Sequence, residues 1–139
     1  MTDSVFIDTN ILIYAHDSDA GRKREVASAA LVELWQSRRG ALSTQVLQEF
    51  YVNVTRKIAH PLDREVASEI VERYAAWRPI AGDHELLLSA LQMERRFSLS
   101  FWDAMIAAAA VRSGAKTLLT EDLQHGQVLD GVRIENPFL

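Results

Sequence analysis

Short apolar runs alternate with longer stretches of helical periodicity along the chain. The short runs predict buried strands at residues 5–7, 41–44, 117–120 and 132–134. In the longer stretches, apolar positions repeat with the period of an α-helix and predict helices that begin near residue 11 and cover 21–39, 45–58, 63–77, 83–97 and 101–113. Gly40 is expected to end the second helix, and Asp83 to cap the fifth. This alternation predicts an α/β fold around a short, mostly parallel sheet, in a single domain over residues 1–139.

The composition narrows the chemistry that is available to the protein. Hydrophobic residues make up 48% of the 139 residues and charged residues 24%, which is typical of a globular domain. The chain has no cysteine, which excludes a disulfide scaffold, a thiol nucleophile and a cysteine-ligated metal site. The longest charge-free apolar stretch, residues 104–111, is far too short to span a bilayer. We therefore expect a cytoplasmic protein with no membrane partner.

Four acidic residues stand at unusual places in this pattern. Asp8 and Asp122 follow the first and third predicted strands, Glu49 lies in the second turn of a helix, and Asp103 lies in the first turn of a nearly all-apolar helix. Each also has an ordinary structural explanation. Asp8 can cap the helix after it, Glu49 can be solvated, Asp103 can form a capping box with Ser100, and Asp122 can belong to a polar turn.

Taken together, the four acids point to one site. The carboxyl ends of parallel strands meet at one edge of a sheet, so these side chains are expected to lie close together. Clustered carboxylates repel each other unless a cation lies between them, and oxygen ligands suit Mg²⁺ or Mn²⁺. The net charge of −4 gives no general attraction for nucleic acid, but bound metal ions would let an acidic protein hold a phosphodiester.

Four segments of the sequence resemble the PIN domain and, more closely, the VapC-type toxins of bacterial toxin–antitoxin pairs. They are F-I-D-T-N-I-L-I-Y at residues 6–14, the helix around Glu49, F-W-D-A-M-I-A-A-A-A at 101–110 and L-T-E-D-L at 119–123. The resemblance implies a three-layer α/β/α fold and a Mg²⁺- or Mn²⁺-dependent endoribonuclease, which hydrolyses RNA and inhibits translation as the toxin of a type II pair. It also implies a homodimer and a cognate VapB-type antitoxin that covers the site.

The same resemblance assigns the site residue by residue. Its catalytic and metal-binding acidic positions correspond to Asp8, Glu49, Asp103 and Asp122. The hydroxyl of Thr120 would support the site, and Asn10 belongs to the polar turn beside Asp8. Because Glu121 and Asp122 are adjacent, either of them fits the fourth acidic position.

Other functions fit the chain less well. A PIN-like module that only binds RNA or a protein would be favoured by a missing acid, but all four positions are acidic. A phosphatase of the haloacid dehalogenase type would have a second aspartate two residues after Asp8, where Asn10 stands. The basic residues at 22–24 and 56–57 are typical of solvated helix ends, and the alternative is that one of these groups flanks a path for RNA.

Overall fold

A computed structural model describes residues 3–139, and these residues form a five-stranded sheet in the order β2-β1-β3-β5-β4. The strands are β1 (Val5–Ile7), β2 (Gly40–Ala41), β3 (Thr117–Leu119), β4 (Val128–Leu129) and β5 (Val132–Glu135). All neighbouring pairs are parallel except β4 and β5, which are antiparallel. The predicted mostly parallel sheet is therefore confirmed.

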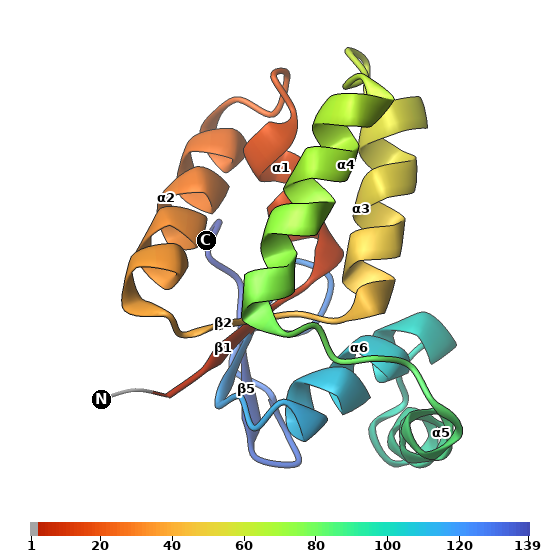
Figure 1. Cartoon of the computed structure of the whole chain (residues 1–139). Coiled ribbons are helices and arrows are strands. Elements are labelled where there is room, and N and C mark those ends of the chain that lie inside the picture. Colours follow the sequence, from red (N-terminus) through yellow and green to blue (C-terminus); the bar gives the residue numbers. More distant parts are fainter. Residues whose placement is uncertain (1–2) are drawn as a thin grey trace.

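Helices cover both faces of this sheet (Figure 1). They are α1 (Thr9–His16), α2 (Arg22–Ser37), α3 (Thr44–Arg56), α4 (Arg64–Arg73), α5 (His84–Phe97) and α6 (Phe101–Arg112). Helices α1 to α4 gather on one side, and α5 and α6 pack together on the other. Successive strand residues point to opposite faces, and both Phe6 and Ile7 are fully buried, as is Leu118. Both faces are thus covered, which confirms the three-layer α/β/α arrangement.

Side-chain caps fix where helices α3, α5 and α6 begin. Ser43 Oγ accepts the backbone N–H of Val46 at the start of α3 (3.3 Å), and Ser100 Oγ accepts that of Asp103 at the start of α6 (3.3 Å). The predicted cap at Asp83 is confirmed, because its Oδ1 accepts the N–H of Leu86 (2.8 Å). The caps of α3 and α6 matter most, since these helices carry Glu49 and Asp103.

The predicted end of the second helix is wrong. Helix α2 ends at Ser37, because Arg38 takes a left-handed conformation (φ 59°) and terminates it. Gly40 instead belongs to strand β2, where Trp77 packs against its backbone. Trp77 itself ends a short 3₁₀ helix, η1 (Tyr74–Trp77), so the predicted single helix over 63–77 is in fact α4 followed by η1.

Replacing Gly40 with alanine is expected to destabilise the fold by about 1–3 kcal/mol. A Cβ atom at this position would lie 2.3 Å from the Trp77 ring, so either the indole or strand β2 must shift. Gly82→Ala is a matched control, because a Cβ there meets nothing within 4 Å. Urea unfolding of the two variants tests this, and equal midpoints would contradict the packing argument.

No helix within residues 3–139 has both the length and the apolar character that crossing a bilayer requires.

Candidate active site

Asp8 lies at the junction of β1 and α1, where the sheet register sets its surroundings. Ile7 pairs with Leu119 in the parallel β1–β3 ladder, and the N–H of Asp8 donates to the Leu119 carbonyl (3.0 Å). The residue directly after β3 is Thr120, whose hydroxyl donates to Asp8 Oδ2 (2.8 Å). Asp8 Oδ1 accepts the N–H of Thr9 (2.7 Å), so Asp8 also caps α1. The side chain is only 5% exposed and held by two fixed donors.

Asn10 connects Asp8 to Asp122. Its Nδ2 donates to Asp122 Oδ2 (3.0 Å), to Thr120 Oγ1 (3.2 Å) and, at longer range, to Asp8 Oδ2 (3.4 Å). The Thr120 hydroxyl accepts the backbone N–H of Asp122 (3.0 Å), which fixes the loop after β3. The structure therefore brings together the first and fourth predicted acids with two of the three predicted supporting residues, Asn10 and Thr120.

Glu49 approaches the same place from helix α3. Its Oε1 accepts the hydroxyl of Thr9 (2.5 Å), and its Oε2 accepts the side-chain amide of Gln45 (3.3 Å). Neither of these partners was predicted from the sequence. Signals for both were present, because Thr9 directly follows Asp8 and Gln45 stands one helical turn before Glu49.

Asp103 lies in the first turn of α6. Its backbone N–H is capped by Ser100, and within the described residues its carboxylate accepts no hydrogen bond. Of the two hydrogen bonds of a capping box, the one from the Asp103 N–H to the Ser100 hydroxyl is present. The reciprocal bond to the Asp103 carboxylate is absent from the described residues. The negative charge of Asp103 raises the pKa of Asp122, so these two carboxyl groups are neighbours.

The carboxylate of Glu121 is bound by side chains that do not line the cleft. Its carboxylate accepts the hydroxyl of Tyr14 and forms an ion pair with Lys23 (Oε1 to Nζ, 2.7 Å). Asp122, the next residue, lines an open cleft of about 480 Å³ together with Asn10 and Glu49. The geometry therefore favours Asp122 over Glu121 as the fourth acid.

Burial dominates the electrostatics of Asp8. The pKa of Asp8 is raised from 3.8 to about 7, chiefly by the loss of hydration and to a smaller extent by the nearby charges of Asp122 and Glu49. The hydrogen bonds from Thr120 and Thr9 act in the opposite direction. The positive charge around Asp8 is therefore too small to stabilise its ionised form fully.

The pKa of Asp122 is raised as well, first by burial and then by the charges of Glu121 and Asp103, while the Asn10 hydrogen bond lowers it. The Oδ1 atom of Asn10 is buried and has no hydrogen-bond partner in the described part of the chain. Two carboxyl groups with raised pKa values and an unpaired carbonyl oxygen form an oxygen-only donor set that fits a hard divalent cation. Among residues 3–139, no three acidic or histidine side chains stand close enough to share one ion without moving.

The fold and the acidic cluster define a class of protein. The PIN domain family model matches residues 5–128, so the chain belongs to the PIN domain family. No curated protein sequence matches the chain significantly.

Three solved structures have a similar fold. A toxin–antitoxin complex from Klebsiella pneumoniae has a TM-score of 0.68 and 22% identity, over 96% of this chain and 98% of that one. VapBC2 from Rickettsia felis, bound to a DNA fragment from its promoter, has a TM-score of 0.65 and 18% identity, over 95% and 97%. The toxin VapC20 of Mycobacterium tuberculosis, which cleaves the sarcin–ricin loop, has a TM-score of 0.64 and 22% identity, over 83% and 87%.

Proposed function

We propose that this protein is a divalent-metal-dependent endoribonuclease and the toxin of a type II toxin–antitoxin pair that inhibits translation. The observation that carries the proposal is the hydrogen-bonded group of Asp8, Asn10, Thr120 and Asp122 at the carboxyl ends of β1 and β3. Glu49 lines the same cleft as Asp122, and the charge of Asp103 raises the pKa of Asp122. Membership of the PIN domain family and the fold shared with VapC-type toxins support it.

The chain's own groups have distinct tasks in this proposal. Asp8, Asp103 and Asp122 would hold the ion, and Glu49 would complete its ligands or orient the attacking water. When bound, Mg²⁺ or Mn²⁺ supplies positive charge to the scissile phosphate and acidifies water. The Thr120 hydroxyl and the backbone N–H of Thr9 fix the Asp8 carboxylate, so its two oxygens are oriented before a ligand arrives.

The partners follow from the same proposal. RNA is the substrate, and a VapB-type antitoxin is the cognate inhibitor, whose basic side chain would enter the acidic cleft and compensate its charge. Two of the similar solved structures are toxin–antitoxin assemblies, which supports an antitoxin partner. A homodimer is part of the proposal as well.

Incubation of the purified, antitoxin-free protein with total RNA tests the activity. We expect discrete fragments with Mg²⁺ or Mn²⁺, none with EDTA, and none from Asp8→Asn under any condition. A folded wild-type protein that cuts no RNA with either ion would contradict the proposal. That result would favour the non-catalytic PIN-like module that binds RNA or a protein.

Substitutions of the two adjacent acids in the loop after β3 should have very different effects on the rate of RNA cleavage. Asp122→Asn is expected to lower the cleavage rate at least about 100-fold, because a group of the reacting site is lost. Glu121→Gln is expected to keep most of the activity, because Glu121 contacts Tyr14 and Lys23 outside the cleft. Initial rates on one RNA compare the two, and a larger loss in Glu121→Gln would reverse the assignment of the fourth acid.

A further inference from the structure

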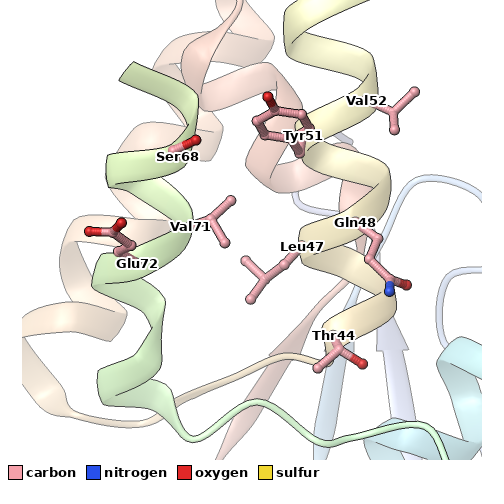
Figure 2. A pocket seen from close by; sticks show the side chains of 8 residues that line it. All are labelled: Thr44, Leu47, Gln48, Tyr51, Val52, Ser68, Val71 and Glu72. Atoms are coloured by element: carbon pink, nitrogen blue, oxygen red, sulfur yellow. The ribbon is translucent and has the colours of Figure 1, made fainter. Parts of the chain in front are cut away.

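Helix α3 separates two hollows of different chemistry. Towards α4 lies a groove of about 590 Å³, into which Leu47 and Tyr51 of α3 and Val71 of α4 point (Figure 2). The cleft on the other side of α3 contains Glu49 and the acids around it. Among the described residues that line this groove there is no cationic side chain, and Glu72 adds a negative charge, so phosphates are disfavoured there. The cleft on the other side of α3 is therefore the better path for a nucleic acid.

The side of α3 that lines the cleft carries a polar row. Glu49, Asn53 and Lys57 all line the cleft and are four residues apart, which places them on one face of the helix. The Asn53 side chain donates to the backbone carbonyl of Glu49 (2.8 Å), so it lies flat along this face. We call these three residues the polar face of α3.

Lys57 is the one cationic side chain among the residues described as lining the cleft. It is exposed, and it forms no ion pair with any acid in residues 3–139. It follows Glu49 by eight residues, which corresponds to about 12 Å along the helix axis. Its positive charge is therefore available to a ligand, about two helical turns beyond Glu49 on the same side of α3.

We propose that Lys57 is a positioning residue that binds an RNA phosphate a few nucleotides from the scissile bond, so that the substrate runs along the polar face of α3. The inference rests on the proposed function and adds a direction for the bound strand. A single ammonium group in an acidic cleft attracts the backbone and leaves the metal-binding carboxylates free. Lys57 would thus affect substrate binding and leave the chemical step alone.

A purely structural role for Lys57 is the competing explanation. A cation at the C-terminal end of a helix interacts favourably with the helix dipole, and Lys57 is the C-cap of α3. Arg56 provides the matched control, because it lies in the last turn of the same helix and does not line the cleft. Lys57→Gln and Arg56→Gln remove the same charge from the same helix end.

The first experiment measures steady-state cleavage of one single-stranded RNA by the wild type and both variants. We expect Lys57→Gln to raise KM about fivefold with kcat unchanged, and Lys57→Arg to restore KM. The slope of log KM against log salt concentration is expected to fall by about 0.7 in Lys57→Gln, which corresponds to one lost phosphate contact. Arg56→Gln should match the wild type in both quantities.

The second experiment measures RNA binding without cleavage, by fluorescence anisotropy of the same RNA with Asp103→Asn protein in Mg²⁺. Adding Lys57→Gln to this background should weaken binding about fivefold, and adding Arg56→Gln should not. Equal binding of all three proteins, or equal weakening by both substitutions, would overturn the role of Lys57. If the wild type cuts no RNA but Lys57 still controls binding, the proposed nuclease activity fails and the RNA path stands.

Discussion

Replacing Asp103 with asparagine is expected to lower RNA cleavage about 1,000-fold or more while the melting temperature stays the same or rises slightly. The charge of Asp103 raises the pKa of Asp122, so the two carboxyl groups are close. The substitution removes no hydrogen bond of helix α6, because the Asp103 carboxylate accepts none within the described residues. Its negative charge adds to the repulsion of Asp122, which offsets the favourable interaction of a first-turn acid with the helix dipole. Initial rates together with thermal unfolding of the same samples measure both effects.

Ser100→Ala is the control for the helix cap. It removes the hydroxyl that accepts the N–H of Asp103, which is expected to cost about 1 kcal/mol of stability while most of the activity is kept. The two variants therefore have opposite profiles. If Asp103→Asn loses as much stability as Ser100→Ala and still cleaves RNA, Asp103 is a capping residue and the four-acid site is wrong.

The free energy of unfolding of the metal-free protein is expected to contain a contribution from Asp8 that falls as the pH rises. The folded-state pKa of Asp8, about 7, lies above its ordinary value of 3.8, so the folded protein binds this proton more tightly than the unfolded chain. The contribution is complete below pH 3.8 and is lost as the pH rises through 7. Its full size is roughly 4 kcal/mol.

Comparison with Asp8→Asn isolates this contribution, since asparagine does not titrate. In EDTA, the wild type is expected to lose stability relative to Asp8→Asn between pH 4 and pH 8, as measured by urea unfolding. At pH 8, Mg²⁺ or Mn²⁺ at 100 times its Kd should raise the free energy of unfolding of the wild type by about 2.7 kcal/mol. The same ion should raise that of Asp8→Asn by less. A difference between the two proteins that does not change with pH would contradict the burial of an ionised Asp8.

Much of the site was predictable because it depends on local order along the chain. Asp8 and Asp122 each follow a strand, and parallel strands end at one edge. The direction of each side chain was not predictable. Glu121 and Asp122 are adjacent, and the choice between them depends on Tyr14 and Lys23, which meet Glu121 only after the chain has folded.

The fold shows the same division. The β4–β5 hairpin was missed although its turn residues, Asp130 and Gly131, both have the positive φ values (48° and 87°) that such tight turns require, and an Asp-Gly pair is a recognised signal for them. No nearby residue in the sequence indicated why a glycine stands at position 40. A glycine is required there because Trp77, 37 residues later, occupies the space that a side chain would fill.

The proposed function requires that Asp8, Glu49, Asp103 and Asp122, which come from four separate segments of the chain, bind one divalent cation together. A calorimetric titration of the RNA-free protein with Mn²⁺ tests this most directly. The variants to compare with the wild type are Asp8→Asn, Glu49→Gln, Asp103→Asn, Asp122→Asn and, as the control, Glu121→Gln. We expect the wild type and the control to bind Mn²⁺ alike, and the other four to bind it more weakly. Equal Mn²⁺ affinity in all six proteins, or no binding by the folded wild type at millimolar Mn²⁺, would contradict the account.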